Sequence, residues 1–142
     1  MNLQDYQNEW TKDSAIDKDK IDIESLQVPK LHSKYLNFLS TERSKLKKLT
    51  KKKDVLHNIL IDYYLGVIDG KDINRVPWQV TETKASAARR VDADKTMRKL
   101  LETIDDIEEN VLFLKEVIFS INQRNFSIKN YNDWFKFTQG NQ

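Results

Sequence analysis

The clearest structural signal in the sequence is MRKLLETIDDIEENVLFLKEVIFSI, residues 97–121. Its apolar residues recur at intervals of three and four without a miss: Met97, Leu100, Ile104, Ile107, Val111, Leu114, Ile118 and Ile121. This spacing places an apolar stripe along one side of an α-helix, and a stripe sustained over more than three heptads is typical of helices that pack along their length. We therefore predict a long, packed helix here.

The second half of this stretch is apolar on more than one side. From Val111 onward, further apolar residues occupy other faces, as in a helix that is buried on several sides: Leu112, Phe113, Val117 and Phe119. A chain of 142 residues, of which 39% are hydrophobic, has a modest core of its own. We therefore expect other copies of the chain to cover this helix. The expected interface residues are Leu100, Ile104, Ile107, Val111, Leu114, Val117, Ile118 and Ile121.

The rest of the chain also favours helices, because it holds only 3 Gly and 2 Pro among 142 residues. Residues 3–10 have the apolar spacing of a short amphipathic helix. A longer helix is predicted from about Lys30, just after Pro29, to Leu65. Residues 128–137 form a final amphipathic segment, so the expected fold class is mainly α.

Two short segments leave room for a β element. Residues 16–28 alternate partly between apolar and charged residues, which fits a short strand or an irregular extension. A brief strand at residues 78–80 is the other candidate, inside a connector that spans residues 66–85. We expect one structural unit with two regions, residues 1–90 carrying the basic helix and residues 91–142 serving oligomerisation.

The sequence offers no set of residues for catalysis. The 2 histidines, His32 and His57, lie far apart and lack metal-ligand spacing, and there is no Cys. The 3 glycines form no phosphate-binding loop, so we expect no enzyme activity, no metal and no cofactor. No apolar run approaches the roughly 18 residues of a membrane helix. Because no secretory signal precedes the first helix either, we expect a cytoplasmic protein without a membrane partner.

The strongest functional signal is RSKLKKLTKKK, residues 43–53, in which seven of eleven residues are basic and none is acidic. The net charge is only +2, partly because residues 1–26 hold seven acids against three lysines. On a helix, Leu46 and Leu49 share one side and the bases cover most of the remainder, so packing leaves a cationic ridge outside. Such a ridge neutralises phosphates, which predicts binding to single-stranded nucleic acid. The candidate contacts in this run are Arg43, Lys45, Lys47, Lys48, Lys51, Lys52 and Lys53.

Two other interpretations of the basic run remain open. A run of lysines is also typical of a solvated helix face, or of a face matched by acidic residues of a neighbouring subunit, such as residues 105–109. A second basic cluster favours nucleic-acid binding: Lys84, Arg89, Arg90, Lys95, Arg98 and Lys99. Proteins that bind single strands usually add aromatic rings on which bases stack. The candidates are Tyr35, Phe38, Tyr63, Tyr64 and, best placed for exposure, Trp78.

Four stretches of the chain carry a resemblance to a known family. They are Leu3-Gln4-Asp5 with Lys12-Asp13 and Ile16-Asp17; Leu31-His32-Ser33-Lys34-Tyr35-Leu36-Asn37; Asp62-Tyr63-Tyr64-x-Gly66 with Asp69-Gly70; and Arg124-x-Phe126-x-Ile128-Lys129 with Asp133, Phe137 and Gly140. In their order and intervals they resemble the UvsY recombination mediators of T-even-type phages, over essentially the whole chain.

The resemblance implies a non-enzymatic mediator of phage homologous recombination and recombination-dependent replication, acting in the cytoplasm of the infected bacterial host. Proteins of this family bind single-stranded DNA and form ring-like homo-oligomers of six or seven subunits, with the C-terminal region taking part in assembly. They help a UvsX-type phage recombinase to load onto DNA coated by the phage single-strand-binding protein.

The resemblance also bears on individual residues. The positions that look basic in the family are Lys34, Arg43, Lys48 and Lys53, so Lys34 joins the candidate phosphate contacts. The family has a further Lys and Arg where this chain has Asn58 and Leu60, and the neighbouring lysines of the run offer charge upstream instead. A structural coiled-coil scaffold and a general nucleic-acid-binding protein for RNA or duplex DNA remain as alternatives, although the sequence has no RNA-recognition or helix-turn-helix signature.

Overall fold

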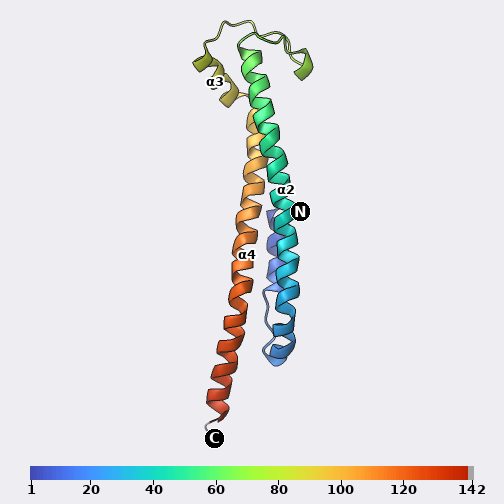
Figure 1. Cartoon of the computed structure of the whole chain (residues 1–142), viewed down its shortest axis with the longest axis vertical. Helices are drawn as coiled ribbons and strands as arrows, with labels where there is room; N and C mark the ends of the chain where they lie inside the picture. Colours follow the sequence, from blue (N-terminus) through green and yellow to red (C-terminus); the bar gives the residue numbers. More distant parts are fainter. Residues whose placement is uncertain (141–142) are drawn as a thin grey trace. The chain divides into compact units, whose positions relative to one another are not determined.

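The computed structural model describes residues 1–140, and all their regular elements are helices (Figure 1). The elements are α1 (Leu3–Asp13), the 3₁₀ helix η1 (Lys18–Lys20), α2 (Ile21–Tyr64), the 3₁₀ helix η2 (Lys71–Ile73), α3 (Lys84–Ala93) and α4 (Lys95–Gly140). The predicted mainly α fold is confirmed. Neither candidate strand forms within these residues, because residues 21–28 belong to α2 and residues 78–80 lie in an irregular connector.

Helix α2 begins nine residues before the predicted start at Lys30, and Pro29 lies inside it. A proline in a helix removes one backbone hydrogen bond, which is why the sequence suggested a start at that position. Tertiary contacts explain the longer helix. Val28 is buried, and Glu24 accepts a hydrogen bond from Arg124 of α4 at 3.0 Å. Packing of the first two turns therefore outweighs the bond that Pro29 cannot make.

Helix α3 was not anticipated from the sequence, and its local signal is a capping box. The Thr83 side chain accepts a hydrogen bond from the Ser86 backbone N–H at 3.1 Å, and the Thr83 N–H donates to the Ser86 hydroxyl at 2.8 Å. These two bonds satisfy donors that the first turn of a helix leaves free. The same device begins α1, with Asn2 and Asp5 as the pair. The final amphipathic segment predicted at residues 128–137 is part of α4.

The chain packs into two compact units, residues 1–43 with 108–142 and residues 44–107. This grouping differs from the division into residues 1–90 and 91–142 that the sequence suggested, because α2 and α4 each contribute to both units. No helix in the described part of the chain is long and apolar enough to cross a membrane. Residues 1–140 also contain no group of three or more His, Cys, Asp or Glu side chains placed to hold a metal ion.

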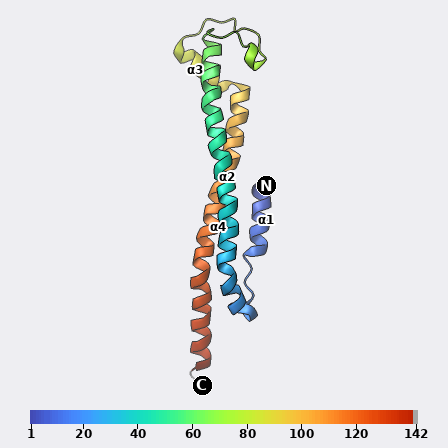
Figure 2. The same ribbon diagram turned by 45° about the vertical axis from the view of Figure 1, so that its right-hand side comes forward.

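In the first unit, α1 lies against the N-terminal half of α2 (Figure 2). Tyr6 of α1 and Tyr35 of α2 are almost completely buried, and both rings contact Phe38, with centroids 5.2 and 5.4 Å apart. The core also encloses Glu42, which accepts hydrogen bonds from the Tyr6 hydroxyl at 2.7 Å and the Asn110 side-chain amide at 3.2 Å. The two hydrogen bonds to this buried carboxylate link α1 and α4 to α2 and fix the positions of the three helices along one another.

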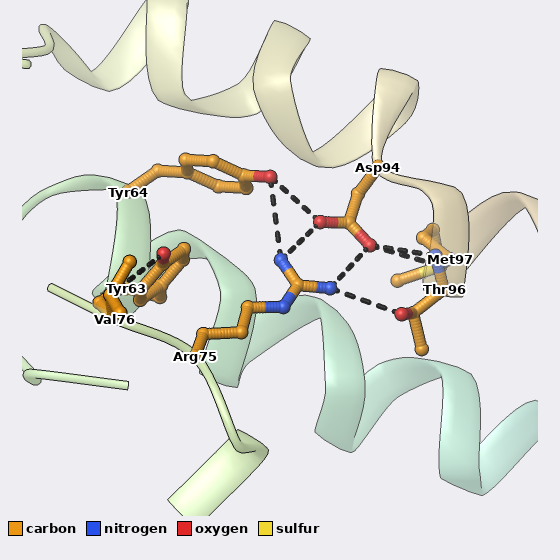
Figure 3. A network of polar contacts seen from close by, with 7 residues as sticks. All are labelled: Tyr63, Tyr64, Arg75, Val76, Asp94, Thr96 and Met97. Atoms are coloured by element: carbon orange, nitrogen blue, oxygen red, sulfur yellow. Dashed lines mark hydrogen bonds and ion pairs between the residues drawn. The ribbon is translucent and has the colours of Figure 1, made fainter. Parts of the chain in front are cut away.

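In the second unit, the end of α2, the connector, α3 and the start of α4 enclose a small apolar core. Its buried residues are Leu60, Tyr63, Tyr64, Ala87, Val91 and Met97. A polar network closes one side of it (Figure 3). Arg75 donates to both carboxylate oxygens of Asp94, and Asp94 also accepts from the Tyr64 hydroxyl at 2.7 Å. The network therefore ties the connector to the junction between α3 and α4.

Candidate nucleic-acid interface

The basic run of α2 forms a continuous cationic surface on the solvent side of the helix. Its exposed bases are Arg43, Lys45, Lys47, Lys48, Lys51 and Lys52, which we call the basic ridge. At about 100° per residue these six side chains cover roughly 200° of the helix circumference. Leu46 and Leu49 on the opposite side are half-buried, and so is Lys53, which lies between them. Lys53 is thus the one predicted base of this run that points toward the packed side.

The charges of the basic ridge are weakly compensated. Within residues 1–140, no carboxylate forms an ion pair with Arg43, Lys47, Lys48, Lys51 or Lys52. The acidic residues 105–109 of α4, considered as partners of such a face, are likewise without an ion pair in the described chain. Like charges at helical spacings of three and four repel one another, so an anionic ligand would stabilise this surface.

Lys34 has a different environment from the ridge lysines. Its ammonium group donates to Glu9 at 2.8 Å and to Asp13 at 2.7 Å, and both acceptors belong to α1. Burial lowers the pKa of Lys34, but the hydrogen bonds to Asp13 and Glu9 outweigh this effect and hold the pKa above its ordinary value. In this structure Lys34 fastens α1 to α2, and its charge is outnumbered by two carboxylates.

The second basic cluster lies in the second unit, on α3 and the first turn of α4, and all six of its side chains are exposed. Within residues 1–140, Arg90 and Arg98 have partners in the chain. Arg90 pairs with Glu82 at 3.0 Å and lies over the Trp78 ring, 5.2 Å from its centroid. Arg98 donates to the backbone carbonyl of Asp92 at 3.3 Å. In the described part of the chain, the cluster therefore combines two arginines that bond to the protein itself with four bases, Lys84, Arg89, Lys95 and Lys99, that form no ion pair.

The aromatic residues proposed as stacking platforms are packed into the protein. Tyr35, Tyr63 and Tyr64 are buried, and Phe38 and Trp78 are half-buried. The Trp78 and Tyr64 rings pack edge-to-face with their centroids 4.8 Å apart, and Arg90 lies over the Trp78 ring. These two neighbours cover the surface on which a base would stack. The sequence placed Trp78 in a polar connector, but the connector folds back over the end of α2. None of the five rings is presented to a base in this structure.

The two positions at which the chain departs from the family pattern have different environments. Asn58 is exposed on α2, whereas Leu60 is 0% exposed in the core of the second unit. Burial of a leucine side chain contributes roughly 1.5–3 kcal/mol to stability. Leu60 therefore serves packing, and a phosphate contact at this position is excluded by its burial.

Most of the residues predicted to form the oligomer interface are covered by the chain itself. Ile104, Val111, Leu114, Val117 and Ile121 are buried, and Leu100, Ile107 and Ile118 are half-buried. The heptad pattern correctly indicated a packed stripe, but that stripe faces other helices of the same chain. The opposite side of α4 exposes Leu112, Phe119 and Phe126, spaced seven residues apart, which we call the outer stripe.

Comparisons with known proteins agree with this fold. The family described as "Recombination, repair and ssDNA binding protein UvsY" matches residues 9–141. The recombination protein uvsY of Enterobacteria phage T4 is 29% identical over 140 residues, which is 99% of each chain. A crystal structure of the bacteriophage T4 recombination mediator protein UvsY, lattice type II, matches with a TM-score of 0.88 and 27% identity over 98% of each chain. Lattice type I of that protein gives a TM-score of 0.85 at 27% identity, over 94% of this chain and 98% of that one.

Proposed function

The chain belongs to the UvsY family of recombination, repair and single-stranded-DNA-binding proteins, and we propose that it is a non-enzymatic recombination mediator that binds single-stranded DNA through the basic ridge of α2. In this role it promotes loading of a UvsX-type phage recombinase onto DNA coated by the phage single-strand-binding protein. The process serves phage homologous recombination and recombination-dependent replication in the cytoplasm of the infected bacterial host.

One observation carries the proposal, namely the exposure of the ridge, five of whose six bases (Arg43, Lys47, Lys48, Lys51 and Lys52) form no ion pair with a carboxylate among residues 1–140. Each lysine or arginine that neutralises a phosphate releases condensed counterions, so affinity for single-stranded DNA falls with salt with a logarithmic slope of about −0.7 per phosphate. The contact is made to the backbone and is therefore independent of sequence. A mediator has to act on any stretch of coated DNA, and a backbone-binding ridge suits that task.

Assembly of several subunits would increase the affinity for DNA, because each subunit adds its own phosphate contacts. We propose a ring-like homo-oligomer of six or seven subunits, in which the exposed outer stripe, rather than the buried heptad stripe, contacts neighbouring copies. A few phosphate contacts per subunit bind weakly at physiological salt, but linked ridges raise the effective concentration of each further contact. DNA wrapped on such an array has a fixed shape. A shape that the recombinase accepts and the single-strand-binding protein does not would shift coated DNA toward the recombinase.

The first experiment tests the basic ridge. Lys47, Lys48, Lys51 and Lys52 are changed together to Ala, and labelled oligothymidine is titrated at two salt concentrations. We expect a large loss of affinity and a logarithmic salt slope reduced by roughly 3, as four lost phosphate contacts require. A matched variant removes four charges of the second cluster (Lys84, Arg89, Lys95 and Lys99). Equal losses in both variants would indicate general cationic binding, and an unchanged slope in the ridge variant would exclude the ridge as the binding surface.

Two further measurements address the alternatives. Competition between single- and double-stranded oligonucleotides separates a mediator from a general nucleic-acid-binding protein, because the proposed function requires preference for the single strand. A coiled-coil scaffold would show no DNA binding near 100 mM salt. Strand exchange with a UvsX-type recombinase and coated DNA then tests the loading step. Wild-type protein is expected to shorten the lag of the reaction, and the ridge variant is expected not to.

A further inference from the structure

The last part of the connector, between η2 and α3, is held at both ends but has an open main chain. At its start, the Tyr63 hydroxyl donates to the Val76 carbonyl at 2.7 Å (Figure 3). At its end, Thr83 caps α3. Between these points, residues 76–82 form no backbone–backbone hydrogen bond within residues 1–140. We call residues 76–82 the open segment, because its peptide groups are left to an outside partner.

The open segment has the composition of a β-strand. Valine, tryptophan and threonine favour strands, and Val76 is restricted to extended conformations because it precedes Pro77. The strand that the sequence predicts at residues 78–80 thus has local support, but residues 1–140 contain no strand that could pair with it. Val76 is 77% exposed and Val80 50%. The missing requirement for a strand here is a neighbouring strand.

The open segment also forms one wall of a groove of about 530 Å³. The lining residues are Gly66, Val67, Ile68, Asp69, Asp72, Pro77 and Trp78. Val67 is 69% exposed, so part of the apolar lining is accessible from outside. The groove therefore offers an apolar wall and two carboxylates beside a main chain that has no partner.

The charge around the groove is negative, in contrast to the basic ridge. Residues 54–74 hold four acids and one base, Lys71. Lys71 is 86% exposed and lies 3.8 Å from Asp69, so their pairing is weak. Arg90 of the second basic cluster lies over Trp78, but it is paired with Glu82 at 3.0 Å. The groove thus disfavours DNA and suits a lysine or arginine whose apolar stem packs on its wall.

We propose that the open segment pairs, as a β-strand, with an extended segment of the recombinase that places a lysine or arginine in the groove. This inference rests on the proposed function and deepens it by naming the surface that holds the recombinase. In such pairing, main-chain hydrogen bonds provide affinity and alternate side chains provide specificity. The lysines of the basic ridge belong to the same compact unit. A docked recombinase is therefore kept close to the DNA that the ridge binds.

Two other occupants suit this surface less well. Contacts within a ring join two different surfaces of neighbouring copies, so identical open segments do not meet one another there. The single-strand-binding protein has to leave the DNA during loading, and a site in the same unit as the ridge would retain it. The recombinase has to stay beside the DNA after docking, which this position provides.

The first test separates main-chain pairing from side-chain contact. Successive N–H groups of a strand point to opposite sides, so only one of Val80→Pro and Thr81→Pro removes a hydrogen bond to the partner. Val80→Thr keeps the N–H and is the control. Binding of a UvsX-type recombinase to the full-length variants is measured without DNA, alongside oligothymidine affinity and circular dichroism. We expect one proline variant to bind at least about tenfold more weakly, because a partner carbonyl loses its donor. The other variants and the oligothymidine affinities are expected to stay within about twofold of wild type.

The second test addresses the groove and leaves the main chain unaltered. Asp72→Lys is expected to weaken recombinase binding at least about threefold, because the incoming cation would meet a like charge. Asp92→Lys is the matched control outside the groove, since Asp92 is also exposed and has no ion pair among residues 1–140. It is expected to bind the recombinase like wild type.

The docking proposal is overturned if wild type does not bind the recombinase without DNA, or if the two proline variants lose affinity equally or not at all. It is also overturned if Asp72→Lys and Asp92→Lys bind alike, or if the variants lose affinity for the single-strand-binding protein instead. The proposed function fails differently. Wild type that neither binds oligothymidine nor shortens the lag of strand exchange would exclude that function. Wild type that does both, with every variant binding the recombinase normally, would leave the function intact and exclude the docking surface.

Discussion

The ammonium nitrogen of Lys34 lies 2.7 Å from Oδ2 of Asp13, and the same oxygen accepts a hydrogen bond from the Tyr35 hydroxyl at 2.9 Å. A candidate DNA contact is therefore part of the joint between α1 and α2. Glu9 adds a second carboxylate at 2.8 Å, so a phosphate at this position would meet two negative charges for one positive charge. Lys34 and the ridge lysines are expected to respond differently to the same substitution.

Lys34→Ala is expected to lower stability while leaving the salt slope of oligothymidine binding unchanged, whereas Lys48→Ala is expected to reduce the slope by about 0.7.

Because the pKa of Lys34 is raised above 10.5, its stabilising contribution is complete below that value and is lost as pH rises through the higher folded pKa. Urea unfolding at pH 7 and at pH 11.5 measures this. A difference between wild type and Lys34→Ala that does not shrink at the higher pH would contradict the assignment.

The environment of Asp94 predicts how the stability of the fold changes at low pH. Burial raises the pKa of this carboxyl, but hydrogen bonds from Arg75, Tyr64 and the Met97 backbone outweigh it and lower the pKa from 3.8 to about 2. The depressed pKa stabilises the fold above about pH 4, by roughly 2 kcal/mol, and this contribution is lost as pH falls toward 2. Asp94→Asn is expected to remove that pH dependence and to cost about 2 kcal/mol or more at pH 7, because Arg75 loses its partner.

The matched control for this prediction is Asp92→Asn. Asp92 is exposed and its carboxylate has no ion pair among residues 1–140, so the substitution is expected to change the unfolding free energy by less than about 0.5 kcal/mol. Thermal unfolding of both variants between pH 2 and pH 7 makes the comparison. Parallel pH profiles for Asp94→Asn and wild type would show that the network in Figure 3 does not stabilise the second unit.

Alanine substitutions at Gly70 and Gly66 allow the effect of backbone strain to be compared with the effect of steric conflict. Both have positive φ, +92° and +77°, where an alanine costs roughly 1 kcal/mol or more. A Cβ on Gly66 meets nothing within 4 Å, whereas one on Gly70 would lie 2.7 Å from Cε2 of Tyr63 and 2.9 Å from the Arg75 carbonyl oxygen. Gly70→Ala is therefore expected to cost at least about 1 kcal/mol more than Gly66→Ala in urea unfolding. Equal losses would mean that the connector relaxes freely around Tyr63.

The outer stripe makes a prediction about assembly. Leu112 and Phe119 are exposed, so changing both to Asp is expected to preserve helical circular dichroism while reducing the mass seen in light scattering. Val111 and Leu114 are buried, and the same change there is expected to unfold the first unit through uncompensated buried charge. A double variant of the outer stripe that keeps the wild-type mass would place the interface elsewhere on the chain.

The long helices and the cationic ridge could be predicted from the sequence alone, whereas α3 and the first nine residues of α2 could not. Apolar residues at intervals of three and four specify a helix whatever covers it, and six of the seven bases of the run lie away from the side on which Leu46 and Leu49 pack. These are local properties, because they depend on residues a few positions apart along one helix. The family resemblance could also be recognised from the sequence, because motifs such as Asp62-Tyr63-Tyr64 and Arg124-x-Phe126 are short stretches of neighbouring residues.

The tertiary structure alone decided which of these residues have partners. Lys34 meets Glu9 from 25 positions away, Arg75 meets Asp94 from 19, and the connector places Trp78 against Tyr64. The heptad stripe showed that one side of α4 is buried but could not show whether its cover comes from the same chain or from another copy. An apolar periodicity indicates only that one face of the helix is removed from water. The hydrophobic free energy gained by burying that face is the same whether a helix of the same chain or another copy covers it. Only the packed helices distinguish the buried stripe from the exposed one, and Lys34, which pairs with two carboxylates, from the exposed lysines of the basic ridge.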